Sequence, residues 1–205
     1  MEVTNSNQSL PLMEHFCTLQ GEGRYVGHAS YFLRLGGCDV GCVWCDVKES
    51  WDASKHPMVA IDEMVTHVVA SGVNIAVITG GEPLLHDLSG LTSALQQKGI
   101  RTHMETSGSS PLTGNWDWIC LSPKKFKAPL DEVLQAAHEL KVVVYHPSDL
   151  KWAQDHAAQV SEQCLLYLQP EWGKREEMTP LIIQFIKDNP RWVLSLQTHK
   201  YLNIP

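Results

Sequence analysis

The chain has 205 residues, 43% of them hydrophobic, which fits one globular domain, 1–205, with a full core. Its formal net charge of −7 argues against a nucleic-acid surface, because such surfaces usually carry a basic excess. No stretch reaches the roughly 20 apolar residues of a membrane-spanning helix, and the polar start MEVTNSNQS lacks the apolar segment of a signal peptide, so no membrane association is expected.

The predicted elements alternate between strands and helices along the chain. A first strand, 30–35, runs into a cysteine-rich loop. Apolar residues at helical spacing then predict a helix over 61–69, with Gly72 as its C-terminal stop, and the apolar run 75–78 predicts a buried strand. A further helix carries leucines on one face and stops at Gly99. Later strands are predicted at 101–105, 118–121, 141–145, 164–168 and 192–196, and later helices near 130–140, 150–158 and 180–188.

This order predicts an α/β fold, with a parallel sheet and crossover helices, closed or partly closed as a barrel. Polar motifs follow several predicted strands, at the carboxyl ends where barrel enzymes build their sites. The motifs are GGEP (80–83), ETSG (105–108), SPK (122–124), QPEW (169–172) and QTH (197–199). One such motif is weak support, because turns are polar in any case, but five converging motifs predict a site.

The loop at 38–45 holds three cysteines, Cys38, Cys42 and Cys45, in the spacing C-x3-C-x2-C. Fourfold thiolate sites such as structural zinc usually arrive as two C-x-x-C pairs. Three ligands suit a [4Fe–4S] cluster whose fourth iron stays open to chelate a small molecule. The alternatives are a zinc loop completed by a histidine and three core cysteines grouped by coincidence, although the tight clustering argues against coincidence. Six cysteines, three of them clustered, fit a reducing compartment better than a disulfide framework, so a cytoplasmic location is expected.

Two further features accompany this loop. The aromatic Trp44 precedes the last cysteine, and ITGGEP follows at 78–83. Together with the cysteine spacing they resemble the radical S-adenosylmethionine (SAM) superfamily, in which one iron of a three-cysteine [4Fe–4S] cluster binds the cofactor. The GGEP segment resembles that superfamily's cradle for the methionine amino group. The resemblance implies a single radical SAM domain over 1–205.

Three stretches narrow the resemblance: LQGEG (19–23), CDVKESWD (45–52) and SLQTHKYLNIP (195–205). From about residue 10 onward the chain is similar to the 7-carboxy-7-deazaguanine synthase family, which serves queuosine and deazapurine biosynthesis and so tRNA modification. This resemblance implies a partial, trimmed TIM-like barrel of about six parallel strands with reduced helices. It also implies a C-terminal tail that contacts the substrate, a homodimer, and a flavodoxin- or ferredoxin-type electron donor.

In that family a lyase reaction converts 6-carboxy-5,6,7,8-tetrahydropterin to 7-carboxy-7-deazaguanine, with ring contraction and release of ammonia. The resemblance implies that the open iron chelates the amino and carboxylate groups of SAM. One electron from the reduced cluster then yields methionine and a 5′-deoxyadenosyl radical, which takes hydrogen from C6 of the pterin. The substrate radical rearranges and recovers a hydrogen, so that the cofactor can be regenerated.

The resemblance also implies roles for individual residues. The cluster-binding and catalytic residues are the three cysteines of the loop. The implied SAM contacts are Trp44, Asp46, Gly80, Gly81, Glu82, Ser122, Pro123, Lys124, Gln169, Pro170, Glu171 and Trp172. The implied substrate contacts are Leu19, Gln20, Gly21, Glu22, Arg34, Thr79, His199 and Pro205, the last through its terminal carboxylate.

Some of these roles have a physical reason and a plain alternative. The Gln20 amide and the Glu22 carboxylate can both pair with the guanidine-like edge of a pterin. Arg34 can clamp a substrate carboxylate through two parallel hydrogen bonds, or it is simply a charge at the end of a strand. His199 is a pterin contact or a capped structural histidine.

One position departs from the family pattern. The family usually has threonine or serine directly after the cluster Cys-Asp, where the hydroxyl helps to hold a Mg2+ ion shared with the substrate carboxylate. This chain has Val47, whose side chain has no oxygen for a hard cation. The resemblance therefore implies a Mg2+ cofactor whose usual hydroxyl ligand is missing in this chain.

Two rival functions compete with this interpretation. One is a glycyl-radical or ribonucleotide-reductase activase, which is similar in size and in its cysteine loop but acts on a protein partner. The QGEG and QTHKYLNIP stretches favour the small molecule instead. The other is a non-enzymatic electron carrier or zinc-binding module, which needs four protein ligands and has no use for GGEP.

Overall fold

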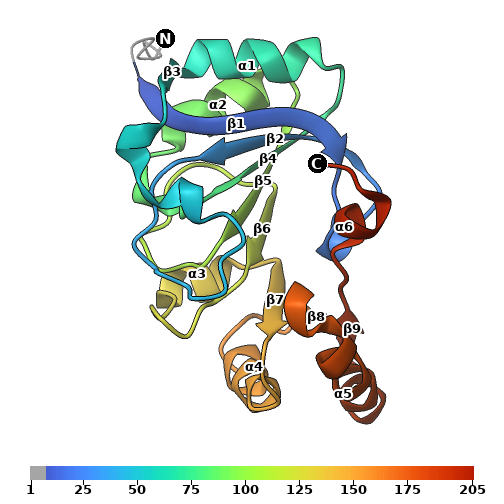
Figure 1. Cartoon of the computed structure of the whole chain (residues 1–205). Helices are drawn as coiled ribbons and strands as arrows, with labels where there is room; N and C mark the ends of the chain where they lie inside the picture. Colours follow the sequence, from blue (N-terminus) through green and yellow to red (C-terminus); the bar gives the residue numbers. More distant parts are fainter. Residues whose placement is uncertain (1–7) are drawn as a thin grey trace.

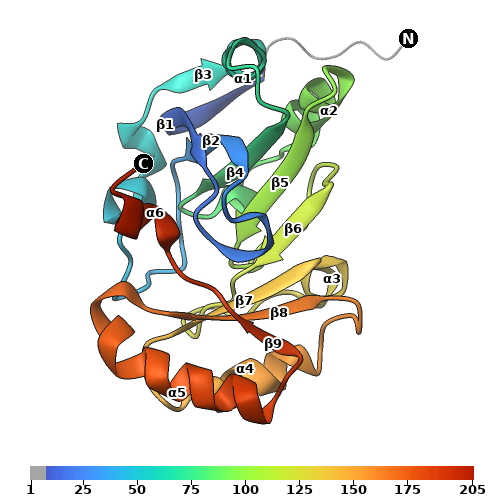
Figure 2. The ribbon, with the colours of Figure 1, turned by 90° about the vertical axis from the view of Figure 1, so that its right-hand side faces the viewer.

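The computed structural model describes residues 8–205, and within this range one curved sheet of nine strands forms the framework (Figures 1 and 2). The strand order is β3-β1-β2-β4-β5-β6-β7-β8-β9. Seven neighbouring strands are parallel: β2 (Ala29–Leu35), β4 (Ile75–Gly80), β5 (Arg101–Thr106), β6 (Trp118–Leu121), β7 (Glu139–Val144), β8 (Leu165–Pro170) and β9 (Trp192–Leu194). The α/β class and the partial barrel are confirmed, with seven parallel strands where about six were expected.

Two strands were not predicted, and both are antiparallel. β1 (Ser9–Leu19) pairs with β2 on one side and with β3 (Met58–Ala60) on the other. A register shift between Leu12 and Glu14 interrupts the β1–β2 ladder. Such a bulge breaks the alternation of inward and outward side chains, which is the pattern by which a strand is recognised in sequence.

The helices lie on the outer side of the curved sheet, apart from the last one (Figure 2). They are α1 (Ile61–Ala70), α2 (Ser89–Gln97), α3 (Asp131–Ala136), α4 (Asp149–Ala157), α5 (Arg175–Asp188) and α6 (Thr198–Leu202). α3 is shorter than predicted because the chain is already extended at Glu139, where β7 pairs with β8. α5 begins before Pro180, which was expected at its start. No helix within residues 8–205 is long and apolar enough to cross a membrane.

Alternation along the parallel strands separates the core from the site. Ile78, Met104 and Leu168 are fully buried in the hydrophobic core that includes residues of α1, α2 and α5. The residues that follow them, Thr79, Glu105 and Gln169, line a cavity on the concave face instead. Because side chains alternate between the two faces of a strand, apolar residues pack under the helices while polar ones face the cavity.

The sheet does not close on itself, and the C-terminal segment spans the opening between β9 and β1. Thr198 donates its backbone N–H to the carbonyl of Gly21 at 2.9 Å. Gly23 donates its N–H to the Ser195 hydroxyl at 3.0 Å. α6 therefore lies against the turn that follows β1, and the chain's last residues approach the carboxyl ends of the parallel strands (Figure 2).

Candidate active site

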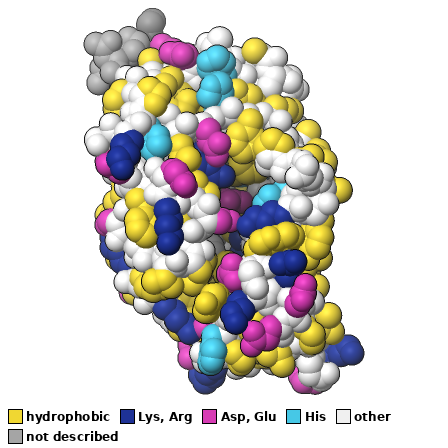
Figure 3. All heavy atoms as spheres, in the orientation of Figure 1, with side chains coloured by type: hydrophobic (Ala, Val, Ile, Leu, Met, Phe, Trp, Pro, Cys, Tyr) yellow, Lys and Arg dark blue, Asp and Glu magenta, His cyan; other side chains and the backbone are white. Residues whose placement is uncertain are grey.

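A cavity of about 280 Å³ lies at the carboxyl ends of the parallel strands. Figure 3 shows it as a hollow in this face, with acidic and basic side chains around it. Nearly all predicted site residues line it, from the turn after β1, the cysteine loop, the strand ends and the C-terminal segment. The exceptions are Glu82, Pro123 and Pro170. Chain order alone placed the polar motifs at these strand ends, where the structure has the cavity.

The cysteine loop forms one wall of the cavity. Cys42 is buried, Cys38 and Cys45 are half-buried, and all three are free thiols that line the cavity. Glycines at positive φ, Gly37 at 106° and Gly41 at 71°, turn the chain at the two ends of the first cysteine segment. β2 ends at Leu35, so the sheet itself holds the start of this loop.

The donor set fits a [4Fe–4S] cluster. Across residues 8–205, no three His, Cys, Asp or Glu side chains meet closely enough to surround one metal ion. A cluster makes a different demand, because each cysteine binds its own iron. Burial raises the pKa of the Cys42 thiol, and the nearby Lys124 ammonium acts in the opposite direction. The three free thiols around one cavity wall are therefore the residues that would hold a cluster.

The GGEP segment lies directly against the start of the cysteine loop. Gly81 donates its N–H to the Leu35 carbonyl at 3.1 Å, and Glu82 donates its N–H to the Gly37 carbonyl at 2.8 Å. A Cβ on Gly81 would lie 2.2 Å from the Gly37 carbonyl oxygen, so only glycine permits this approach. The backbone of Gly80 and Gly81 thus becomes part of the cavity wall.

The Glu82 side chain does not reach the cavity, contrary to its expected role as a SAM contact. It is 1% exposed, and its oxygens accept hydrogen bonds from the Leu84 N–H at 3.0 Å, the Ser107 N–H at 2.8 Å, and the hydroxyls of Thr106 and Ser107. Glu82 therefore fastens the GGEP turn to the end of β5. Pro123 and Pro170 also lie outside the lining, while the residues on either side of each proline line it.

The remaining predicted SAM contacts line the cavity between the cysteine loop and β8. Lys124 donates to the carbonyl and hydroxyl oxygens of Ser122, both at 2.6 Å, and its Nζ lies 5.7 Å from the centre of the Trp44 ring. Trp172 stacks edge-on against Tyr201, with 5.0 Å between the ring centres. The contacts of Lys124 join the segment after β6 to the cysteine loop, and the ring pair joins the segment after β8 to α6.

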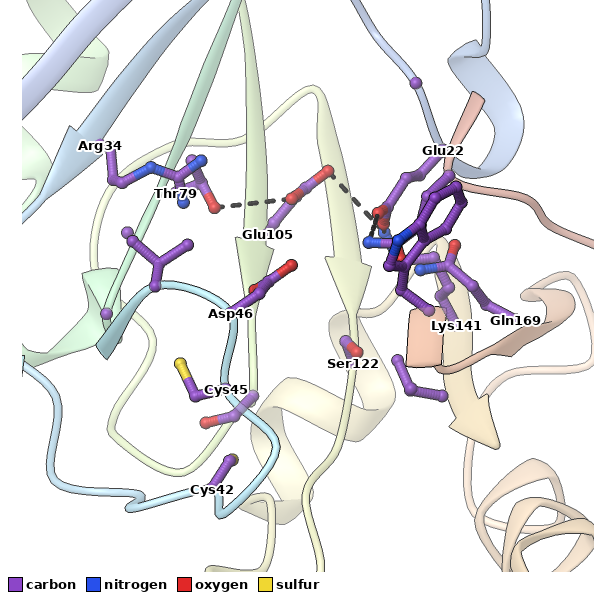
Figure 4. Close-up of a pocket in the computed structure, with 18 of the residues that line it drawn as sticks. Glu22, Arg34, Cys42, Cys45, Asp46, Thr79, Glu105, Ser122, Lys141 and Gln169 are labelled. Carbon is purple, nitrogen blue, oxygen red and sulfur yellow. Dashed lines mark hydrogen bonds and ion pairs between the residues drawn. The ribbon is translucent and has the colours of Figure 1, made fainter. Parts of the chain in front are cut away.

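The opposite side of the cavity is a network of charged and amide side chains (Figure 4). Lys141 forms an ion pair with Glu22, and its Nζ lies 3.8 Å from Glu105. Gln20 donates to Glu105 at 3.0 Å. Gln197, from the C-terminal segment, donates to the second Glu22 oxygen at 2.9 Å. The network therefore presents two carboxylates on the side of the cavity opposite the thiols.

The charge of Glu22 is set by two opposing effects. Burial raises the pKa of this carboxyl group, but the Lys141 ammonium and the hydrogen bonds from Lys141 and Gln197 outweigh burial and lower the pKa to about 2. Glu22 is thus ionised at neutral pH and can accept hydrogen bonds from N–H groups of a ligand.

Arg34 and Thr79 lie on neighbouring strands at the cavity wall (Figure 4). Arg34 pairs through Nε with Glu14 at 2.6 Å, and its guanidinium faces the cavity. Thr79 donates to Glu105 at 3.5 Å. Arg34 is therefore a cavity residue as well as a partner in a surface ion pair.

The C-terminal segment supplies the last predicted residues. Gly21 packs so tightly on His199 that a Cβ there would lie 2.2 Å from the imidazole Nδ1. Burial lowers the pKa of His199 and so favours the neutral imidazole. The nearby Glu22 carboxylate acts in the opposite direction. The Pro205 backbone oxygen accepts a hydrogen bond from the Thr18 hydroxyl at 3.3 Å, and Pro205 lines the cavity.

Sequence reasoning missed part of the lining. Glu105 and Gln197 lie inside motifs noted at strand ends, so their position was available, but neither was given a role. Lys141 was missed altogether, although a lysine inside an apolar strand, ELKVVV, is itself a signal of a buried charge. The other lining residues that were not assigned are Phe16, Phe32, Val40, Trp51, Thr106, Ser107, Val143 and Lys200.

Comparisons with known proteins agree with this arrangement. Residues 33–147 match the model of the Radical SAM superfamily. A 7-carboxy-7-deazaguanine synthase of Flavobacterium psychrophilum is 54% identical over 203 residues, covering 99% of this chain and 96% of that protein. The protein of the same name from Escherichia coli K12 is 34% identical, covering 95% of this chain and 98% of that one. The crystal structure of QueE from Escherichia coli superposes with a TM-score of 0.84 at 31% identity, over 93% of this chain and 95% of that chain.

Proposed function

This chain belongs to the 7-carboxy-7-deazaguanine synthase family of the radical SAM superfamily, and we propose that it converts 6-carboxy-5,6,7,8-tetrahydropterin to 7-carboxy-7-deazaguanine with release of ammonia. The alternative of an activase for a protein partner is not favoured, because the similar proteins over nearly the whole chain are named as synthases of this small molecule. One observation carries the proposal: a single cavity has three thiols at one wall and an acceptor-rich polar network at the other.

When bound, the [4Fe–4S] cluster and SAM supply a carbon radical that removes a hydrogen atom from the substrate. Cys38, Cys42 and Cys45 would hold the cluster. The GGEP backbone, Ser122 to Lys124 and Trp172 would hold SAM beside it. The protein's contribution is to keep water away and to fix the distance between the two ligands, because a radical reacts with whatever atom lies nearest.

The polar network would hold the pterin. Glu22 and Glu105 accept N–H hydrogen bonds from the amino-pyrimidine edge, while the Gln20 amide matches the adjoining donors and acceptors. Arg34 would clamp the substrate carboxylate with the nitrogens that Glu14 leaves unused. The cavity thus turns the saturated ring of the substrate toward the thiol wall.

The cavity offers few protein ligands for a Mg2+ ion near position 47. Val47 lines the cavity without an oxygen, and the neighbouring Asp46 carboxylate is paired with Lys200 at 2.8 Å. A hard cation needs oxygen ligands, so any Mg2+ ion would be held by the substrate carboxylate, water and a backbone carbonyl. We therefore propose weak Mg2+ binding.

Three further proposals rest on the family rather than on the cavity. The electron donor would be a flavodoxin- or ferredoxin-type protein, the working unit a homodimer, and the location the cytoplasm. The six free cysteines support a reducing compartment. The single radical SAM domain over 1–205, with its cluster loop at 38–45 and its substrate-contacting tail, is part of the same proposal.

Isotope transfer tests the proposed reaction. The reconstituted and reduced protein is incubated without oxygen with SAM and with carboxytetrahydropterin deuterated at C6. Deuterium in recovered SAM or deoxyadenosine is the expected result, because the hydrogen removed from C6 is returned through the cofactor. Cofactor cleavage with all deuterium retained in the pterin would contradict the proposed substrate.

A further inference from the structure

A buried lysine without an assigned role lies in β7. The Lys141 side chain is 4% exposed. A lysine ammonium is almost never buried this deeply unless it is paired, because removing the charge from water is unfavourable. Its partners therefore decide what it does.

Lys141 contacts the two carboxylates that face the cavity. It pairs with Oε2 of Glu22 and lies 3.8 Å from Oε1 of Glu105. The two glutamates come from separate parts of the fold, the turn after β1 and the end of β5. One ammonium thus links the two acceptors that the proposed function assigns to the pterin.

Each glutamate is also held by a neutral donor. Gln197 donates to Oε1 of Glu22 at 2.9 Å, and Gln20 donates to Oε1 of Glu105 at 3.0 Å. These amides orient the carboxylates but bring no charge. Lys141 supplies the positive charge of this network. Two carboxylates and one ammonium therefore face the space where a ligand rich in N–H donors would bind.

Removing that cation changes the chemistry of the pair. Two carboxylates that share a site without a cation repel each other, which favours protonation of one of them, and a protonated carboxyl group donates where the pterin edge needs an acceptor. The charged and titratable groups facing Lys141 are Glu22, Glu105 from β5, Cys120 from β6 and Glu139 from β7.

We propose that Lys141 is a positioning residue for the substrate, which holds the Glu22 and Glu105 carboxylates together and aims both at the amino-pyrimidine edge. It acts through the two glutamates and has no role in cofactor cleavage, because it lies on the polar side of the cavity, opposite the thiols (Figure 4). The inference rests on the proposed function and deepens it.

Substitution of Lys141 by neutral residues tests the inference. The reconstituted holoenzyme is compared with Lys141→Met, Lys141→Gln and a matched control, Lys125→Met, which removes a lysine that pairs with Asp149 outside the cavity. KM and kcat for carboxytetrahydropterin are measured across pH, together with SAM cleavage in the absence of pterin. Lys141→Gln can still donate to both glutamates, so it carries the test if Lys141→Met does not fold.

The expected result is a KM at least tenfold higher in both Lys141 variants, with pterin-independent SAM cleavage within twofold of wild type. The pH profile of kcat/KM should show an added ionisation that wild type and Lys125→Met lack. Combining Lys141→Met with Glu22→Gln should raise KM by less than the product of the two single fold-changes, because both substitutions act on one network.

An unchanged KM in folded Lys141 variants would overturn the inference and leave the proposed function standing. Parallel loss of SAM cleavage would also overturn it, since that marks a general structural role. A wild-type protein that cleaves SAM but leaves the pterin unchanged would overturn the proposed function and this inference together.

Discussion

Lys200 donates a hydrogen bond to Asp46, with 2.8 Å between Nζ and Oδ2, and so joins the last helix of the chain to the cysteine loop. The two residues are far apart in sequence and meet at the edge of the same cavity. The bond from Thr198 to Gly21 holds the other side of this helix against the turn after β1. The C-terminal segment therefore covers the opening that the curved sheet leaves.

A C-terminal extension tests the role of this segment. If the Pro205 carboxylate binds the substrate, a peptide tag after Pro205 should raise KM at least tenfold, because loss of a charged hydrogen bond costs about 1.5–3 kcal/mol. The same tag at the N-terminus is the matched control. An enzyme with equal KM in both tagged forms would show that Pro205 has no direct contact with substrate.

Alanine substitution tests the cluster ligands. Cys38→Ala, Cys42→Ala or Cys45→Ala should each abolish reductive SAM cleavage and lower the iron content, because three thiolates are the smallest set that holds the cluster. Cys17→Ala is the control, since Cys17 is an exposed residue of β1 outside the cavity. Full cleavage by Cys42→Ala would contradict the ligand assignment. An equal loss of cleavage in Cys17→Ala would point to Cys17 as a ligand instead.

Valine at position 47 predicts weak dependence on Mg2+. Val47→Thr restores a hydroxyl at the cavity wall, so Mg2+ should activate the variant more strongly than wild type at limiting substrate. SAM cleavage without pterin should not change. Magnesium titrations of the two proteins provide the comparison. Identical and strong activation would show that the side chain at 47 never anchored the metal.

The ionised state of Glu22 predicts a loss of stability in acid. The pKa of Glu22 is about 2 in the folded chain, below the ordinary value of 4.5, so this carboxylate stabilises the fold above about pH 4.5. That contribution, on the order of 3 kcal/mol, is lost as the pH falls from 4.5 toward 2. Denaturant unfolding at several pH values should show a flatter profile for Glu22→Gln. Equal slopes in both proteins would contradict the depressed pKa.

The parts of the site that were predictable depend on short-range sequence. Three thiols within eight positions lie in one loop whatever the rest of the chain does, and chain order puts GGEP and QPEW at the same edge of a parallel sheet. The strands were found where apolar runs are bounded by turns, and β6 was predicted with its observed ends, Trp118–Leu121.

The parts that were missed depend on register and on distant partners. β7 begins at Glu139, two residues earlier than predicted, and its alternation puts Lys141 into the cavity. Glu82 was assigned to SAM because its neighbours in sequence are. Its hydrogen-bond partners Thr106 and Ser107, at the end of the next strand, turn its carboxylate away from the cavity. Local patterns do not contain such contacts.

Anaerobic turnover of 6-carboxy-5,6,7,8-tetrahydropterin is the most direct test of the central claim, which is that one cavity joins a radical-generating cluster to a pterin-binding network. The reconstituted, reduced protein is supplied with SAM, and the deazapurine and ammonia are measured together. The account predicts 7-carboxy-7-deazaguanine and ammonia in equal amounts, with none from Cys42→Ala. SAM cleavage by the wild-type protein without either product would contradict it.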